Sequence, residues 1–325
     1  MVVGWLRPSD DNPSMPMPPF AALGLTLIER DWLSANQIVF AAAPDSPATV
    51  VDTGYVTHAD TTLALVRHAL GAAPLVRIVN THLHADHCGG NQRLQQAWPD
   101  VQTCVPQASL AAVRTWDTWA LGYARVHQHC PPFTADHGLA PGATLLLGGH
   151  PWQIHAAPGH DPHAVLLWEP ASRTLIAGDA LWQARLAIIF PELDDADGFA
   201  PTRATLDLIE QLAPRWVIPG HGPAFADVTS ALAASRRRLD QFEAEPRRHD
   251  AHAARALLMF ALMARTAPSR AALQADLQAT PVFQQMARRL GQRDLAAWTD
   301  ELVQRLLHDG WVVQQGDTLR VATRH

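Results

Sequence analysis

Three histidines and an aspartate are packed into one short stretch of the chain. The sequence THLHADH over residues 81–87 contains His82, His84, Asp86 and His87. Neutral imidazole and carboxylate suit zinc, iron or manganese, whereas soft metals would call for thiolates. The cluster therefore predicts a metal-binding site.

Three further candidate ligands each follow a short apolar or Pro-Gly segment. They are His160 after APG, Asp179 after LIAG and His221 after WVIPG. Open sheets place their sites at the carboxyl ends of strands, where all these segments would present their ligands. Because five histidines and two aspartates suffice for two ions, the sequence predicts two divalent metals, most simply zinc, with iron or manganese as alternatives.

The spacing of the cluster follows from the run of Val, Ile and Leu over residues 75–79, which predicts a buried strand. Side chains two apart on an extended chain point the same way, so His82 and His84 are expected to hold one cation together. The chain should turn after them toward the glycines at 89 and 90. That turn would aim Asp86 and His87 at a second metal.

These residues resemble the motif of the metallo-β-lactamase superfamily, and the resemblance covers roughly residues 20–230. It implies an α/β fold, a four-layer αβ/βα sandwich, with the ligands divided between two metals. One metal would be held by His82, His84 and His160, the second by Asp86, His87 and His221, with Asp179 bridging them. True β-lactamases usually carry a cysteine near the place of Asp179 and lack a carboxylate bridge, so the pattern is closer to the glyoxalase II, lactonase and ribonuclease Z branches.

Several other side chains are candidates for supporting roles. His163 is a possible hydrogen-bonding partner of a ligand or a substrate contact, and Asp52 either orients a ligand histidine or caps a turn. Glyoxalase II proteins usually have a glycine-rich, Arg-bearing segment where this chain has residues 180–193, which disfavours glutathione thioesters. In that segment Trp182, Phe190 and Glu192 are substrate-contact candidates, the alternative being a hydrophobic lid.

Length and composition indicate a two-part enzyme. The chain has 325 residues, more than the usual single domain, and 48% hydrophobic content is enough for a sizeable core. The net charge of −6 argues against a chain devoted to nucleic acid. Three cysteines without metal-type spacing favour a reducing compartment. With no signal peptide or membrane-spanning stretch visible, the protein is expected to be cytoplasmic and not bound to a membrane.

The pattern predicts three regions: a flexible Pro-rich extension over 1–20, the catalytic domain over 21–245, and a smaller, mainly helical domain over 246–325. Strands are expected at 25–30, 37–42 and 49–52, with a helix at 60–70 before the motif strand. Aromatic and apolar residues between 113 and 126 have mostly helical spacing.

The last region is expected to form helices at 251–265, 270–279, 281–290 and 294–308, followed by a hairpin around Gly316-Asp317. Helices closed by a hairpin resemble a winged-helix domain. Nucleic-acid binding is possible because of the basic residues Arg247, Arg248, Arg288, Arg289 and Arg293, but acidic neighbours leave little excess charge. A packing role, or a homodimer contact, is favoured instead.

The predicted function is hydrolysis of a small ester, thioester or lactone by a bridging hydroxide. Two cations lower the pKa of a shared water from about 15.7 toward 7 and polarise the substrate carbonyl. Asp179 would hold the metal spacing and Asp86 would relay a proton to the leaving group. The alternatives are a phosphodiesterase or endoribonuclease, a mononuclear iron dioxygenase of the persulfide type, and a regulator that binds through its winged helix.

Overall fold

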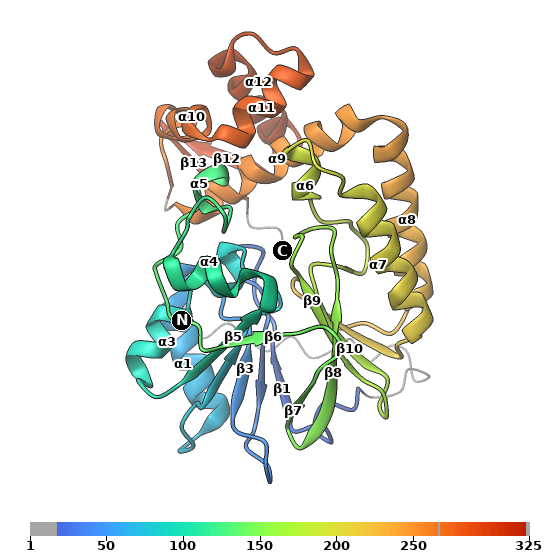
Figure 1. Ribbon diagram of the computed structural model, residues 1–325. Coiled ribbons are helices and arrows are strands. Elements are labelled where there is room, and N and C mark those ends of the chain that lie inside the picture. Colours follow the sequence, from blue (N-terminus) through green and yellow to red (C-terminus); the bar gives the residue numbers. More distant parts are fainter. Residues whose placement is uncertain (1–17, 266, 323–325) are drawn as a thin grey trace.

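The computed structural model describes residues 18–265 and 267–322 of the chain. Most of the predicted extension over 1–20 therefore lies outside the described residues. The described part contains two large β-sheets flanked by helices and a helical region near the C-terminus (Figure 1).

The first sheet has six strands in the order β1-β2-β3-β4-β5-β6. The first three strands are antiparallel, and β3 to β6 are parallel. The strands are β1 (Leu25–Ile28), β2 (Gln37–Phe40), β3 (Thr49–Val51), β4 (Arg77–Val79), β5 (Gln102–Pro106) and β6 (His137–Leu139). The predicted order of three strands, a helix and the motif strand is confirmed, since α1 (Ala59–Leu70) joins β3 to β4.

The second sheet has five strands in the order β11-β10-β9-β8-β7. Only the pair β10–β11 is parallel, so the ends of these two strands come together at one edge. The strands are β7 (Thr144–Leu147), β8 (His150–Ala156), β9 (Val165–Glu169), β10 (Thr174–Gly178) and β11 (Trp216–Pro219). Every residue of β9, β10 and β11 is buried, as expected of strands covered on both faces.

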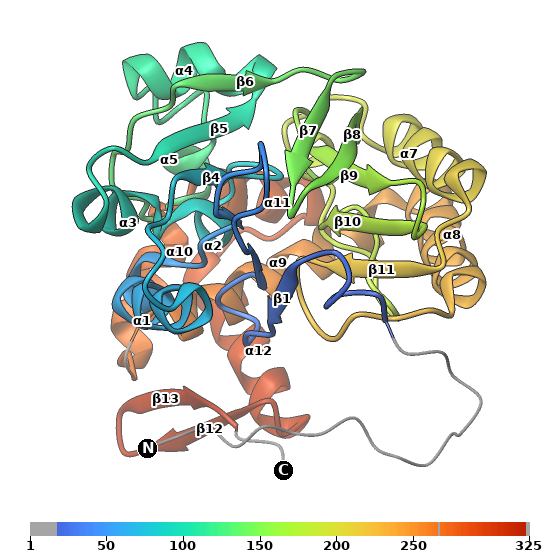
Figure 2. The ribbon, with the colours of Figure 1, turned by 90° about the horizontal axis from the view of Figure 1, so that it is seen from below.

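Four layers result from the way the apolar faces are covered. Side chains of both sheets, among them Phe40 and Trp152, pack together in one core between them. The outer face of the first sheet packs against α1 and α3 (Asn91–Ala97), and that of the second against α7 (Phe199–Leu212) and α8 (Val228–Ala244). Figure 2 shows the two sheets side by side with these helices outside them. The predicted αβ/βα sandwich is confirmed.

The C-terminal region has a core of its own. Its elements are α9 (Pro246–Ala264), α10 (Arg270–Ala279), α11 (Pro281–Leu290), α12 (Leu295–His308), β12 (Val312–Gln315) and β13 (Thr318–Val321). The predicted helices and hairpin are present, but α9 begins five residues earlier than expected, because Pro246 occupies the first helical turn, where no backbone N–H is needed. The core includes Ile188 and Leu193, so it packs directly against the segment that follows Asp179.

The stretch between 107 and 135 is less regular than its spacing predicts. It contains η2 (Gln107–Ser109), α4 (Leu110–Thr115) and α5 (Tyr123–Val126) in place of one aromatic-striped helix. Trp116, with φ 50°, ends α4 in the left-handed region, and Gly122, with φ 85°, precedes α5. Trp116 packs on Phe133 at 5.2 Å, so this aromatic packs on the core.

Three short helical turns complete the description: η1 (Val56–His58), α2 (Ala85–Cys88) and α6 (Phe190–Leu193). Among the described residues, no helix is both long enough and apolar enough to cross a bilayer.

Candidate metal centre

The ligand-bearing segments meet at one edge of the two sheets. Asp179 directly follows β10, and His221 stands two residues after the neighbouring strand β11. His82 lies three residues beyond β4, so His82 and His84 belong to the connection and not to the strand itself. The backbone of His84 is nevertheless extended, and its ring lies 4.7 Å from that of His82. Asp86 and His87 then enter the turn of α2, as expected.

All seven predicted ligands come together. They form three overlapping groups whose potential ligand atoms lie within 4.8 Å of one another: His82, His84 and His160; His82, His87 and Asp179; and Asp86, His87 and His221. The first and third groups share no residue and match the two ligand sets expected from the motif. The second group joins them.

The carboxylate of Asp179 lies between the two sets. Its Oδ1 is 3.3 Å from Nε2 of His87, and its Oδ2 is 3.4 Å from Nε2 of His160. Trp182 donates a hydrogen bond from Nε1 to Oδ1 over 3.1 Å. The carboxylate is thus held in position from outside the ligand set.

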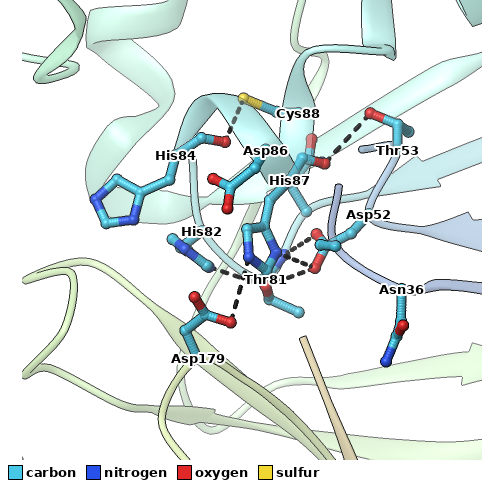
Figure 3. A network of polar contacts seen from close by, with 12 residues as sticks. Asn36, Asp52, Thr53, Thr81, His82, His84, Asp86, His87, Cys88 and Asp179 are labelled. Carbon is cyan, nitrogen blue, oxygen red and sulfur yellow. Dashed lines mark hydrogen bonds and ion pairs between the residues drawn. The ribbon is translucent and has the colours of Figure 1, made fainter. Parts of the chain in front are cut away.

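Asp52 orients the ligands of the first sheet. One oxygen accepts from the backbone N–H of Thr81 at 2.9 Å, and the other from the Thr81 hydroxyl at 2.8 Å and Nδ1 of His87 at 2.7 Å (Figure 3). Because Nδ1 of His87 donates to Asp52, its Nε2, which faces Asp179, is the nitrogen left for a metal ion. Of the two roles considered for Asp52, the structure gives it the orienting one.

Two further imidazoles are oriented by hydrogen bonds at Nδ1. Nδ1 of His82 lies 3.1 Å from the Thr81 hydroxyl, which is already donating to Asp52, so His82 must donate there. His160 donates from Nδ1 to the carbonyl of Ile188 at 2.5 Å. The buried Nε2 of His82 has no hydrogen-bonding partner among the described residues. A buried lone pair aimed at other potential ligands is what a metal ion would satisfy.

The electrostatics of the cluster fit a cation. Burial, then the neighbouring His87, lower the pKa of His82 well below its ordinary value, and burial and His160 lower the pKa of His84 to about 4. Burial alone would raise the pKa of Asp179, but His87 and His221 outweigh it and hold that pKa well below the usual range. Burial alone would lower the pKa values of His87 and His221, but nearby carboxylates, Asp179 first, outweigh it and raise both. Two imidazoles are therefore uncharged, and two would release a proton when a cation binds beside the ionised carboxylate.

The glycine before His221 is required by close packing. A Cβ on Gly220 would lie 2.2 Å from Oδ1 of Asp179 and 2.7 Å from Cε1 of His87. Any side chain here would displace two predicted ligands. The Pro-Gly-His sequence thus brings β11 close to β10 and delivers His221 to the site.

Two of the predicted substrate contacts lie against the ligands. The Phe190 ring is 4.6 Å from that of His84 and 5.4 Å from that of His160. Trp182 packs on His221 at 5.5 Å. Both aromatic side chains therefore border the predicted ligands.

The other two predicted substrate contacts, Glu192 and His163, lie away from the predicted ligands. Glu192 accepts from the backbone N–H groups of Gly198 and Phe199 at 2.7 and 3.0 Å, so its carboxylate caps the start of α7. The His163 ring lies 3.1 Å from the Ser109 hydroxyl. Among residues 18–265 and 267–322, neither side chain forms a hydrogen bond, ion pair or ring contact with a predicted ligand.

Trp32 is a border residue that the sequence did not reveal. Its ring stacks on His221 at 5.4 Å with an interplanar angle of 11°, and meets Trp182 edge-on at 5.3 Å. It follows β1 in a polar loop, and 43% of it is exposed. The signal in the sequence is a tryptophan within the largely polar stretch ERDWLSANQ over residues 29–37.

Cys88 does not join the ligands, although it adjoins them in sequence. Its buried Sγ lies 3.1 Å from the Tyr123 hydroxyl and 3.8 Å from Sγ of Cys130. Figure 3 shows it on the far side of α2 from Asp179. This agrees with a small residue filling the tight corner before Gly89.

The sequence profile described as "Metallo-beta-lactamase superfamily" matches residues 30–221, more than half of the chain and the whole ligand set. The chain belongs to the metallo-beta-lactamase superfamily. The predicted enzyme class, a metal-dependent hydrolase of this fold, is confirmed by this match and by the relatives below.

Two curated relatives and one solved structure illustrate the similarity. The hydroxyacylglutathione hydrolase of Xanthomonas euvesicatoria pv. vesicatoria (strain 85-10) is 30% identical over 238 residues, covering 70% of this chain and 78% of the relative. The acyl-coenzyme A thioesterase MBLAC2 of Gallus gallus is 24% identical over 166 residues, 46% of this chain, so the chain spans only 57% of that relative. A beta-lactamase domain protein from Burkholderia ambifaria superposes with a TM-score of 0.60 at 21% identity, over 97% of this chain and 98% of its own.

Proposed function

We propose that this protein is a dinuclear hydrolase that cleaves a small acyl ester, thioester or lactone. The observation that carries the proposal is the position of the Asp179 carboxylate. One of its oxygens lies near His87 of one ligand set, and the other lies near His160 of the other set. A carboxylate between two ligand sets offsets the repulsion of two cations. His82, His84 and His160 would hold one ion, and Asp86, His87 and His221 the other.

The side chains of the site have separate tasks in this reaction. The metals, when bound, would supply a water of lowered pKa and a Lewis acid for the carbonyl. Asp52 fixes the ring of His87, and Trp182 fixes Asp179. Asp86, whose Oδ2 lies 3.2 Å from Nε2 of His221, is the group we assign to carry a proton toward the leaving group. Phe190 and Trp182 cover the entrance and exclude bulk water.

An acyl thioester is the favoured substrate within this class. The relatives are named as an acyl-coenzyme A thioesterase and hydroxyacylglutathione hydrolases, and both names describe the hydrolysis of an acyl compound. The segment after Asp179 nevertheless differs from the usual glyoxalase II segment, so glutathione is not the thiol we favour. Zinc suits the His and Asp ligands, with iron or manganese as the alternatives.

The C-terminal region is proposed to support the active-site segment, and its resemblance to a winged helix remains a proposal. Its core holds Ile188 and Leu193. Arg289, one of the basic residues considered for nucleic acid, is engaged by Asp195, by Asp250 at 3.2 Å and by the carbonyl of Glu192 at 2.7 Å. An arginine already engaged in this way favours a packing role over nucleic-acid binding. A homodimer and a cytoplasmic location also remain proposals.

The decisive experiment combines metal analysis with a substrate panel. Protein purified without added metal is expected to contain close to two ions per chain by inductively coupled plasma mass spectrometry. It should hydrolyse members of a panel of esters, thioesters and lactones but not phosphodiesters, lose activity on chelation, and regain it with zinc.

Each alternative has its own signature. A reproducible single ion with full activity would contradict the dinuclear site, and oxygen consumption with about one iron per chain would indicate a persulfide-type dioxygenase. RNA cleavage with steep salt dependence would indicate a nuclease. A shift in DNA mobility that survives mutation of the ligands would indicate a regulator.

A further inference from the structure

Four exposed arginines gather beside the segment that follows Asp179. Arg185 lies in that segment, Arg237 and Arg238 in α8, and Arg255 in α9; we call them the arginine cluster. The first three line a hollow of about 430 Å³ that is open to solvent. Segments far apart in the sequence thus bring guanidinium groups to one place.

The charge of the arginine cluster is not neutralised by nearby carboxylates. Between α7 and α8, Arg203 pairs with Asp240 and Glu243, and Arg236 pairs with two acidic residues of α7. No ion pair joins a member of the arginine cluster to a carboxylate among residues 18–265 and 267–322. The field is felt locally, since burial, then Arg238 and Arg255, lower the pKa of His252 to about 4.

A short chain of contacts links the arginine cluster to the metal centre. The Arg185 guanidinium lies 5.1 Å from the centre of the Trp32 ring, which stacks on the predicted ligand His221 at 5.4 Å. Arg185 also lies 6.0 Å from the centre of the Trp311 ring. The nearest arginine is therefore two ring contacts from a ligand, close enough for one small molecule to reach both places.

We propose that the arginine cluster binds the phosphate groups of a phosphorylated acyl thioester whose carbonyl lies at the metal centre. The inference rests on the proposed hydrolase function and names its substrate class. In the reaction, water gives its oxygen to the acyl carbon, the C–S bond breaks, and the thiol that carries the phosphates leaves with a proton.

Charge and geometry favour phosphate over other anions. The planar guanidinium donates two parallel hydrogen bonds to phosphate oxygens. A thiol that bears a diphosphate and a phosphomonoester carries roughly four negative charges at neutral pH, which balances four arginines. Glutathione, with two carboxylates and one ammonium group, would leave most of the positive charge unbalanced.

The test compares substrates that share one acyl group and one thioester bond. Acetyl-coenzyme A carries the phosphates and acetyl-pantetheine does not. The quantity compared is kcat/KM for acetyl-coenzyme A divided by kcat/KM for acetyl-pantetheine. In the double variant Arg237→Gln, Arg238→Gln this ratio should fall about tenfold or more, mainly because KM for acetyl-coenzyme A rises. The matched control is Arg305→Gln, Arg320→Gln, two exposed arginines outside the cluster, which should leave the ratio as in the wild type.

A binding measurement decides the inference independently of turnover. In calorimetry, coenzyme A should bind to the wild type and bind about tenfold more weakly to the double variant. Its affinity for the wild type should fall as the salt concentration rises. Equal ratios and equal binding in wild type and variant would overturn the inference, and so would an equal loss toward S-lactoylglutathione, which would make the cluster a general anion site. If neither thioester is hydrolysed, the proposed function fails, and the coenzyme A titration still decides the cluster.

Discussion

The ligand side chains of the metal centre and the side chains at its mouth differ in how they are held. By the mouth we mean Trp32, Trp182, Arg185 and Trp311. His82 and His87 are almost completely buried, and hydrogen bonds with Thr81 and Asp52 fix their rings. In contrast, 43% of Trp32 and 37% of Trp311 are exposed, and the side chains of the mouth are held mostly by stacking of rings and a guanidinium.

This difference teaches which part of the site is rigid and which is adjustable. Buried, directional hydrogen bonds specify one geometry, which metal chemistry requires. Stacking of exposed rings is less directional and tolerates exchange of side chains. We therefore expect changes at the ligands and their partners to alter kcat, and changes at the mouth to alter substrate preference.

The largest effect is expected for Asp179→Ala. Loss of the carboxylate would leave the two proposed cation positions without the group proposed to bridge them, so kcat should fall by well over the roughly 100-fold typical for a partner of a ligand. Circular dichroism should show an intact fold. Retention of most activity and of two metals would remove Asp179 from the bridging position.

Asp52→Asn should have the next largest effect. The amide can no longer accept from Thr81 and His87 as a charged carboxylate does, and the ring of His87 loses its fixed orientation. A loss of about 10- to 100-fold in metal affinity or kcat is expected. Metal titration against a competing chelator measures the affinity. An unchanged affinity and rate would mean that backbone packing alone orients His87.

A change at the mouth tests whether these side chains set substrate preference. Trp182→Phe keeps an aromatic ring beside His221 but removes the hydrogen bond to Asp179. We expect kcat/KM to fall by about tenfold, because a hydrogen bond to a charged group is lost, and to fall unequally for short and long acyl groups. Kinetics on a series of acyl thioesters checks this. An equal loss on every substrate would place Trp182 with the rigid part of the site.

His249 should link pH to the stability of the segment beside the site. Its Nε2 accepts from the backbone N–H of Ile189 at 3.0 Å, and burial, then His252 and Arg289, lower its pKa from 6.5 to about 3. The unfolded chain binds a proton below pH 6.5 and the folded chain does not. The free energy of unfolding should therefore fall by about 1.4 kcal/mol for each pH unit below 6.5, until the pH nears 3.

Urea unfolding of metal-free protein between pH 7.5 and 4.5 measures this slope. His249→Gln retains an acceptor but does not titrate, so its slope should be smaller by that amount. Identical slopes in the two proteins would show that His249 is protonated in the folded state as easily as in the unfolded chain.

The smallest effect is expected for arginines outside both the ligand cluster and the mouth. Arg288→Ala with Arg293→Ala changes two exposed arginines of the C-terminal region. If the substrate is a small acyl compound, kcat/KM should stay within about twofold, as for most surface changes. A collapse of activity together with a flatter dependence on salt would favour the ribonuclease alternative.

The sequence alone determined the ligand types and part of the strands and helices, and the sandwich fold followed from the resemblance to a known family. Period and composition mark β1 to β4 and α9 to α12, because apolar alternation and helical spacing are local properties. The metal motif is local too. His82 to His87 lie within six consecutive residues, so their proximity needs no tertiary contact. The helical spacing between residues 113 and 126 did not give one continuous helix, because Trp116 and Gly122 adopt left-handed conformations that spacing does not reveal.

Only the tertiary structure decided which partners surround those ligands. Asp52 lies 35 residues from His87, and its choice between capping a turn and orienting a ligand depends on the pairing of β3 with β4. The carboxylate of Glu192 caps the start of α7, a contact that depends on where α7 packs. Trp32 and the arginine cluster carry no periodic signal, because their meeting depends on how the sheets and the C-terminal helices pack. Contacts between distant segments are set by the sum of many buried surfaces, and no local pattern encodes that sum.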